Sequence, residues 1–222
     1  MLEKSRVLVF TTAYRPLIGG SEIALEEMVR HLPDIFFDIL VPKYKRELEK
    51  FEQFKNGTIH RVGLGTQLDK FLFPVSGFIS ALKFHPNVIH AYQASFGAGA
   101  AVVYKFFFPK TRFILTLQEG KNLNKQNFLV KYFRNIIIKK ADNITGISNY
   151  LCSYARKVNS KAKVVLIPNG VDLKQFSISN FQFPKKENKD KTIITVSRLV
   201  EKNGIGDLID AVDVVKKEIP DI

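Results

Sequence analysis

The 222-residue sequence has one cysteine, no tryptophan and no apolar run long enough to cross a bilayer. The single cysteine, Cys152, excludes a disulfide framework within the chain. Lys or Arg interrupts every candidate apolar run, such as Phe71–Phe84, well short of the roughly 20 residues that a membrane-spanning helix needs. The first residues also lack the pattern of a secretory signal. We therefore expect a cytoplasmic protein that does not cross a membrane.

Negative charge is scarce. The sequence has 34 Lys and Arg residues but only 21 Asp and Glu residues, which gives a formal net charge of +13. Such a charge favours a nucleic acid, an anionic membrane surface or a polyanionic ligand as partner. The zinc-ligand spacings and aromatic RNA-binding signatures that usually accompany nucleic-acid modules are missing from the sequence. We expect no nucleic-acid partner. The rival hypothesis, a basic nucleic-acid-binding domain, predicts a steep loss of binding with salt.

Short runs rich in β-branched residues alternate with segments of helical period, which predicts an α/β fold with a Rossmann-like, doubly wound parallel sheet. The predicted strands are Arg6–Thr12, Phe37–Val41, Thr58–Val62, Val88–Ala91, Arg112–Leu117, Asn143–Ile147 and Lys163–Ile167. The predicted helices are Ser21–His31, Asp69–Phe84, Phe96–Phe107, Lys125–Lys140 and Asn149–Lys157. A weaker pattern predicts a further helix over Arg46–Lys55.

The pattern changes after residue 174, which divides the sequence into three parts. Residues 1–174 form the first predicted domain, and residues 175–191 form a polar, Lys- and Asn-rich linker. Residues 192–222 begin a second domain, with a predicted strand over Thr192–Val196 and an apolar helical stripe over Ile205–Lys217. One strand and one helix cannot bury their own apolar faces. We therefore interpret the second domain as incomplete and the chain as truncated.

A glycine pair, Gly19–Gly20, follows the first predicted strand and directly precedes a predicted helix. Glycines let the backbone approach an anion closely, and the free N–H groups of a helix start favour negative charge, so the pair is a candidate phosphate site. A tight turn without a ligand is the alternative. The pair does not match G-x-G-x-x-G, and an acidic residue of the type that binds a dinucleotide ribose is not evident at the expected place, which argues against an NAD enzyme.

Other polar motifs also follow predicted strands directly. Gln118–Glu119–Gly120 follows one strand, and Ile167–Pro168–Asn169–Gly170–Val171–Asp172 begins at the end of another. Ligands of open α/β sheets bind at the edge where such segments meet. Asn169–Gly170 is also an ordinary turn dipeptide, so a purely structural turn is the alternative there.

The motifs in their order resemble family 4 glycosyltransferases. The glycine pair with Glu22, the segment Val88–Ala91, the Ile167–Asp172 segment and the run Val196–Ile205 carry this resemblance across nearly the entire chain. It implies a GT-B fold, with two facing Rossmann-like domains, of which this chain is the N-terminal acceptor-side domain and the start of the donor-binding domain.

The resemblance also implies a retaining transferase that moves a sugar, in the manner of a hexosyltransferase, from a nucleotide diphosphate sugar to a glycan or a lipid-linked acceptor. Positions that match the family's donor-diphosphate site are Gly19, Gly20, Arg198 and Lys202. Positions assigned to substrate binding are Glu22, Gly120, Asn169, Gly170 and Asp172. No Asp-x-Asp metal motif occurs, so we expect neither a metal nor a further cofactor.

Several positions depart from the family's pattern or stay ambiguous. Asn203 stands where family members usually have a lysine, with Lys202 one place early, and Gln118 stands where many have a histidine. Glu119 is either a local acid or base or a solvated loop carboxylate, and we favour the second. His90 at a predicted strand end is either a cleft residue or a packed one. The catalytic candidates are therefore Gln118, Glu119 and His90.

The family's glycine-rich donor loop and Glu-x7-Glu motif are not in the sequence and are expected beyond Ile222. We therefore expect the chain by itself to be inactive. The alternative is a non-catalytic subunit of a split glycosyltransferase that binds the acceptor or recruits a partner.

Two segments combine basic and aromatic residues. They are Leu123–Lys140, which is amphipathic if helical, and Tyr104–Arg112. Either they pack on the sheet with a solvated basic face, or they bind an anionic leaflet. With the charge of +13, they suggest peripheral binding on the inner face of the membrane as one outcome.

Overall fold

The protein is represented by a computed structural model that describes residues 5–120, 123, 126–173 and 192–219, except the side chain of Lys202. The chain divides into two compact units, Met1–Val171 and Asp172–Ile222, which are described separately. The predicted linker 175–191 lies outside the described residues. None of the described helices is long and apolar enough to cross a membrane.

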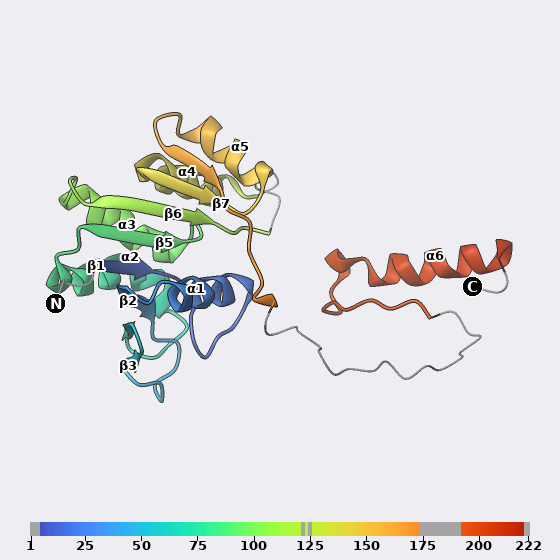
Figure 1. The fold of residues 1–222 in the computed structure, drawn as a ribbon, viewed down its shortest axis with the longest axis horizontal. Coiled ribbons are helices and arrows are strands. Elements are labelled where there is room, and N and C mark those ends of the chain that lie inside the picture. Colours follow the sequence, from blue (N-terminus) through green and yellow to red (C-terminus); the bar gives the residue numbers. More distant parts are fainter. Residues whose placement is uncertain (1–4, 121–122, 124–125, 174–191, 220–222) are drawn as a thin grey trace. The chain divides into compact units, whose positions relative to one another are not determined.

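Unit 1 is built on an eight-stranded sheet with the order β3-β4-β2-β1-β5-β6-β7-β8 (Figure 1). All neighbouring strands pair in parallel except β3 and β4, which are antiparallel. The strands are β1 Ser5–Phe10, β2 Ile35–Pro42, β3 Phe51–Phe54, β4 Gly57–Val62, β5 Val88–Tyr92, β6 Arg112–Leu117, β7 Asn143–Gly146 and β8 Lys163–Leu166. The seven predicted strands are thus confirmed within one or two residues at each end.

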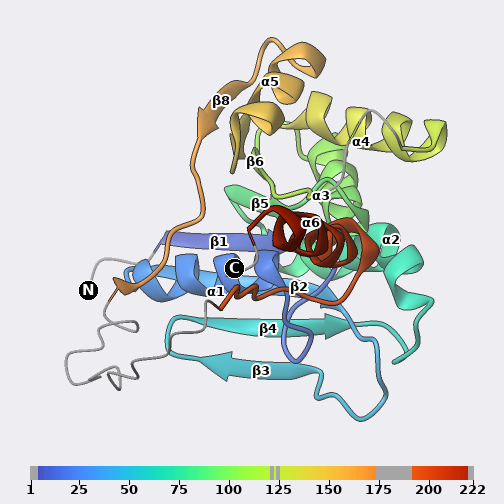
Figure 2. The same cartoon turned by 90° about the vertical axis from the view of Figure 1, so that its right-hand side faces the viewer.

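Helices cover the sheet, and their positions follow the predicted ranges closely (Figure 2). They are α1 Gly20–His31, α2 Asp69–Ala81 with the 3-10 turn η1 Leu82–Phe84, α3 Phe96–Phe107, α4 Phe128–Lys140 and α5 Asn149–Val158. Side-chain caps begin two of them, because Asn127 accepts from the Leu129 N–H and Ser148 accepts from the Leu151 N–H. The predicted first residue of α4, Lys125, lies outside the described residues.

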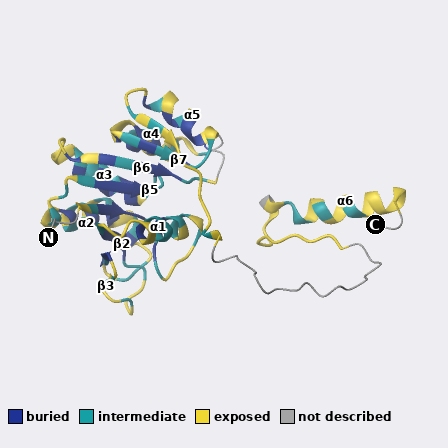
Figure 3. Cartoon of the chain, viewed as in Figure 1, coloured by how far each residue is buried: buried dark blue, intermediate teal, exposed yellow. Residues whose placement is uncertain are grey.

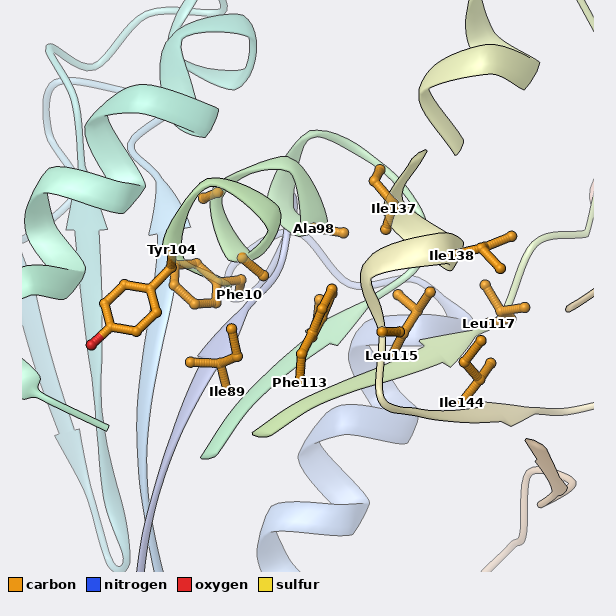
Figure 4. Close-up of a cluster of buried hydrophobic side chains, with 14 of the residues drawn as sticks. Phe10, Ile89, Ala98, Tyr104, Phe113, Leu115, Leu117, Ile137, Ile138 and Ile144 are labelled. Atoms are coloured by element: carbon orange, nitrogen blue, oxygen red, sulfur yellow. The ribbon is translucent and has the colours of Figure 1, made fainter. Parts of the chain in front are cut away.

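The hydrophobic core lies on both faces of the sheet. Alternate residues of β1 enter different clusters, since Leu8 and Phe10 pack with helices α2 to α5 while Val9 packs with α1. The central strands are therefore buried on both faces, as parallel strands usually are (Figure 3). Figure 4 shows part of the larger cluster, where Leu115 and Leu117 of β6 lie near Ile138 of α4. The predicted doubly wound α/β class is confirmed.

The helix predicted over Arg46–Lys55 is wrong. Phe51–Phe54 forms β3, which turns through two residues into β4 and pairs Phe54 with Gly57. The segment Phe-Glu-Gln-Phe-Lys-Asn-Gly alternates partly buried and exposed positions and ends in a turn dipeptide, which is typical of an edge hairpin. Asn56 fixes the turn, because its amide group donates to the carbonyl oxygens of Val29, Leu32 and Ile35.

The strand predicted over Thr192–Val196 is also wrong. Residues 192–198 have no regular secondary structure, and the described part of unit 2 continues through the 3-10 turn η4 Glu201–Asn203 into helix α6 Ile205–Glu218. A strand needs a neighbour for its backbone hydrogen bonds. The described residues of unit 2 contain none, so the β-branched run stays unpaired and largely exposed.

Candidate functional site

Strand order reverses between β1 and β5, and the loops that follow these two strands meet at the carboxyl edge of the sheet. The hydroxyl groups of Thr12 and Ser95 lie 2.7 Å apart, and the Gly97 N–H donates to the Thr12 hydroxyl at 2.9 Å. A Cβ atom on Gly97 would come within 2.7 Å of the Thr11 carbonyl carbon. The reversal point is where open α/β sheets bind their ligands, so these loops frame the candidate site.

Sequence reasoning missed Gly97. Its signal is a glycine in the first turn of a helix, directly after a strand and a short loop, where close backbone contact excludes a side chain.

The glycine pair begins helix α1 at the same edge. Gly19 is the N-cap residue and has extended backbone, without any side-chain cap, while Gly20 is exposed and a Cβ atom there would meet no heavy atom within 4 Å. This helix start therefore offers backbone N–H groups and open space to an anion. Glu22 faces it, because a carboxylate oxygen of Glu22 lies 2.6 Å from the position of a Gly19 Cβ. That carboxylate, which accepts from the Ser21 hydroxyl at 2.7 Å, must turn away before a phosphate can enter.

Two adjoining pockets open beside the loop that follows β1, and charged residues connect their walls. Arg15 and Arg61 contribute to both pockets. The Arg61 guanidinium, which is buried, donates to Glu52 at 2.5 Å and to the Arg15 carbonyl oxygen at 2.9 Å, while Arg15 pairs with Glu26. Burial, with the nearby Glu26 carboxylate, raises the pKa of Tyr14 in the same wall to about 12. Sequence reasoning selected none of these residues as site candidates, because Arg61, Glu52 and Glu26 fell within ranges predicted as a strand or as helices.

Gln118 and Asn169 lie together at the ends of β6 and β8. The Gln118 amide donates to the Asn169 side-chain oxygen at 3.2 Å. Both side chains reach solvent, so the pair can exchange its mutual hydrogen bond for bonds to a hydroxyl-rich ligand. Gly120 and Gly170 nearby are exposed, and a Cβ atom on either would meet nothing within 4 Å.

The expectation that Glu119 is a solvated loop carboxylate is wrong. Its Oε1 accepts from the Ala94 N–H at 2.7 Å, and its Oε2 is buried without a hydrogen-bond partner among the described residues. Burial raises the pKa of Glu119, and the Ala94 bond opposes this rise. Glu119 therefore ties the β6 loop to the β5 loop and holds one carboxylate oxygen available for a further bond.

His90 lies inside the sheet, which agrees with the packed interpretation. Its Nε2 forms a 2.7 Å hydrogen bond with the Thr116 hydroxyl, which lies 2.7 Å from the Thr145 hydroxyl on the next strand. Burial lowers the pKa of His90 to about 4, so the imidazole is neutral at physiological pH. The ladder holds β5, β6 and β7 in register through neutral groups.

The remaining candidates lie in unit 2. Arg198 is exposed, and Asp172 begins the unit, but the side chain of Lys202 lies outside the described part of the chain. Asn203 braces the loop before α6, because its amide donates to the Ser197 hydroxyl at 2.7 Å and to the Arg198 carbonyl oxygen at 2.9 Å. The residue that departs from the family's pattern thus shapes the backbone beside Arg198. Among the described residues, no group of three or more His, Cys, Asp or Glu side chains is arranged to hold a metal.

Comparison with known sequences gives one family and one protein relative. The sequence profile of Glycosyltransferase Family 4 matches residues 18–175. A protein of Methanocaldococcus jannaschii, named as an uncharacterized glycosyltransferase, is 29% identical over 216 aligned positions, which cover 92% of this chain and 56% of that protein. The chain therefore spans little more than half the length of this relative.

Solved structures share the fold. Sucrose-phosphate synthase of Thermosynechococcus elongatus superposes with a TM-score of 0.60 at 16% identity, over 78% of this chain and 49% of that one. UDP-N-acetylglucosamine 2-epimerase of Rickettsia bellii superposes with a TM-score of 0.50 at 13% identity, over 73% of this chain and 44% of that one. A synthase and an epimerase share this fold, so the fold alone does not select a reaction.

Proposed function

Because the chain belongs to glycosyltransferase family 4, we propose that it supplies the acceptor-side domain of a retaining glycosyltransferase. The complete protein would transfer a sugar, as a hexosyltransferase does, from a nucleotide diphosphate sugar to a glycan or a lipid-linked acceptor. The observation that carries the proposal is the start of α1 at Gly19 and Gly20, open at Gly20 and closed by Glu22 at Gly19, beside the point where strand order reverses. A diphosphate and an acceptor can meet there at one sheet edge.

Charge stabilisation is the chemistry proposed for the donor side. The leaving diphosphate gains negative charge as the bond to the sugar breaks, and fixed N–H dipoles and cations stabilise that charge. We assign the N–H groups after Gly19 and Gly20 to this task, together with Arg198 and Lys202 of unit 2. We propose that no metal is needed, because these N–H groups and the two cations would supply the positive potential.

The pockets beside Arg15 are proposed to hold the acceptor, together with Glu22 and the Gln118–Asn169 pair. Glu119 is proposed as the proton-handling group of this edge. Burial raises its pKa, which brings protonation of the carboxyl closer to neutral pH than for an exposed glutamate. His90 is proposed as a positioning residue that acts through Thr116, since it is buried and neutral.

The test uses the open reading frame from Met1 through whatever follows the codon for Ile222. We expect its product to release a nucleoside diphosphate from one member of a panel of nucleotide sugars when acceptor is present. Gly20→Val should abolish this turnover, because the added side chain fills the space proposed for the diphosphate. Ile23→Val, on an exposed position of the same helix, should leave turnover unchanged.

The unfolding transition of Gly20→Val should match that of the parent protein, since a Cβ atom there meets nothing within 4 Å. A variant that folds normally and turns over normally would contradict the donor assignment. Binding of acceptor without any turnover would favour the alternative, a non-catalytic acceptor-binding or partner-recruiting subunit of a split glycosyltransferase.

We further propose that the protein works in the cytoplasm, peripherally on the inner face of the membrane. The net charge of +13 supports an anionic surface as partner, and the resemblance to enzymes with lipid-linked acceptors supports the same location.

A further inference from the structure

Helix α2 is apolar on two opposite sides. Phe73, Gly77 and Ala81 face the core and are buried, as a helix on a sheet requires. Val75 and Ile79 lie on the outer side, with about three fifths of each residue exposed, 61% and 59%. An amphipathic surface helix normally carries polar residues there. The outer stripe of α2 therefore has the composition of a buried face without any covering element among the described residues of unit 1.

The outer stripe is too short to belong to a membrane-spanning segment. Thirteen residues of helix extend about 20 Å, against about 30 Å for the hydrocarbon core of a bilayer. A helix of this length can instead lie in the plane of an interface.

Helix α3 extends the same apolar surface. The rings of Phe71 in α2 and Phe96 in α3 meet edge to face at 5.0 Å, and those of Phe78 and Phe107 stack at 5.1 Å. Phe71, Phe96 and Phe107 all remain exposed. The two helices lie side by side on one face of the sheet, with α4 next to α3 (Figure 2). We call the exposed apolar side chains of α2 and α3 the α2–α3 surface. Its members are Phe71, Leu72, Val75, Ile79, Phe96, Phe106 and Phe107.

The sequence that carries the α2–α3 surface is strongly basic, although Lys105 of α3 pairs with Asp142. From Lys70 to Ala141 the sequence contains eleven Lys or Arg residues and a single acidic residue, Glu119, whose Oε2 is buried. The only acidic residue within α2 itself, Asp69, is buried and accepts from three backbone N–H groups of the preceding loop. Lys70 and Lys83 stand at the two ends of α2, each with its ammonium group over an aromatic ring.

We propose that the α2–α3 surface enters the headgroup region of an anionic phospholipid leaflet. Its apolar side chains bury in the boundary between headgroups and acyl chains, while the bordering lysines bind lipid phosphate groups. A second copy of the chain is a poorer occupant, because a symmetric contact would bring like charges together. This inference rests on the proposed membrane association and identifies the surface that would make the contact. It does not depend on the proposed transfer reaction.

The surface also reaches the candidate site. Phe96 follows Ser95, whose hydroxyl contacts Thr12 at the meeting point of the β1 and β5 loops. A protein docked through α2 and α3 would therefore hold that sheet edge close to the leaflet. This placement suits an acceptor whose lipid tail stays in the membrane.

The first experiment compares two isoleucines of similar exposure on opposite faces of the sheet. Ile79 of α2 is 59% exposed and Ile23 of α1 is 51% exposed. The 222-residue chain is sedimented with vesicles of phosphatidylcholine, with or without phosphatidylglycerol. We expect binding to the anionic vesicles, weakened about tenfold by Ile79→Ser, because one buried aliphatic side chain contributes roughly that factor. Ile23→Ser should bind like the parent chain.

A second experiment uses the absence of tryptophan from the sequence. Phe71→Trp introduces a single fluorophore on the α2–α3 surface, and Ile23→Trp introduces one on α1 as the control. On addition of anionic vesicles, we expect a blue shift and quenching by brominated lipid chains for the first variant and neither for the second. Lys70→Glu combined with Lys83→Glu should weaken binding to anionic vesicles only.

Three results would overturn the inference. Equal loss of binding in Ile79→Ser and Ile23→Ser, or no loss in either, would place the membrane contact elsewhere while leaving the association itself intact. If the parent chain does not bind anionic vesicles, both the membrane role of the α2–α3 surface and the proposed membrane association are contradicted. Concentration-dependent dimers that shield the tryptophan at position 71 without lipid would make a second copy the occupant. None of these results bears on nucleoside diphosphate release, which is measured without vesicles.

Discussion

The sheet has two halves, one on each side of the β1–β5 pair, and they treat polar groups differently. In the half formed by β1 to β4, charged side chains pair with each other, as Arg61 does with Glu52 and Arg6 does with Asp38, which also forms a hydrogen bond with His60. In the half formed by β5 to β8, the neutral ladder of His90, Thr116 and Thr145 joins β5, β6 and β7, and Lys105 and Asp142 form a charged pair before β7. The comparison teaches where each half is vulnerable. The stability of the first half depends on its charged partners. The stability of the second half depends on the buried imidazole of His90 staying neutral.

The largest effect is expected where the two halves touch. Gly97→Val should lower the free energy of unfolding by about 3 kcal/mol or more, since its Cβ would overlap backbone atoms of Thr11 and Thr12. Urea unfolding measures this change. Gly20→Ala is the matched control, with an expected change of at most about 0.5 kcal/mol because its surroundings are open. Near-equal stability of the two variants would mean that the halves do not pack tightly at this joint.

A pH titration separates the two halves. The pKa of His90 is about 4 in the folded protein against 6.5 ordinarily, so the unfolded chain takes up a proton that the folded chain excludes. Stability from this group is complete above about pH 6.5 and is lost as the pH falls to about 4, a loss of the order of 3 kcal/mol. The measurement is urea unfolding of the parent chain and of His90→Gln across this pH range. The difference between their free energies of unfolding isolates His90, because the other titrating groups contribute equally to both.

Asp38 in the other half acts at lower pH. Burial alone would raise its pKa, but hydrogen bonds from His60 and Arg6 hold the pKa below the ordinary 3.8. Its contribution is therefore present above pH 3.8 and is lost only as the pH falls through the lower folded value. If the parent chain and His90→Gln lose stability in parallel between pH 6.5 and 4, the neutral ladder is not the acid-sensitive part.

The regular part of the fold could be predicted from the sequence, because it depends on local patterns. Each of the seven predicted strands is a short β-branched run, and most lie in the buried middle of a parallel sheet. The hairpin strand β3 was missed because it has only four residues, two of them polar, and lies at the sheet edge, where it pairs with β4. The Thr192–Val196 run has strand composition but pairs with no strand among the described residues, and composition alone cannot supply a partner.

The candidate site was predicted in outline only. The glycine pair and the segments after β6 and β8 were found, because residues that follow parallel strands share one edge. The burial of Glu119 was missed since its partner, the Ala94 N–H, is 25 positions away in a loop of another strand. The contact of Arg61 with the Arg15 carbonyl oxygen spans 46 positions. Such distances leave no periodic signal in the sequence.

A smaller effect is expected in the charged half. Arg61→Met keeps much of the side-chain volume but removes the donors to Glu52 and to the carbonyl oxygens of Arg15 and Glu49. The expected loss is about 2 kcal/mol, because the guanidinium is buried while Glu52 keeps partial access to water. Urea unfolding of the parent chain and of Arg61→Met measures this loss.

The smallest effect tests the neutral ladder at its end. Thr145→Val removes one hydroxyl that is partly exposed, and Thr116 keeps its bond to His90, so we expect a loss of about 0.5 kcal/mol. Thr116→Val should cost more, about 1–2 kcal/mol, because it leaves the buried His90 Nε2 without its hydroxyl partner. Equal losses from the two variants in urea unfolding would mean that the ladder is not organised around Thr116. In that case a hydrogen bond at the end of the ladder and one at its centre would contribute equally to stability. The larger loss expected for Arg61→Met would then be explained by the burial of Arg61.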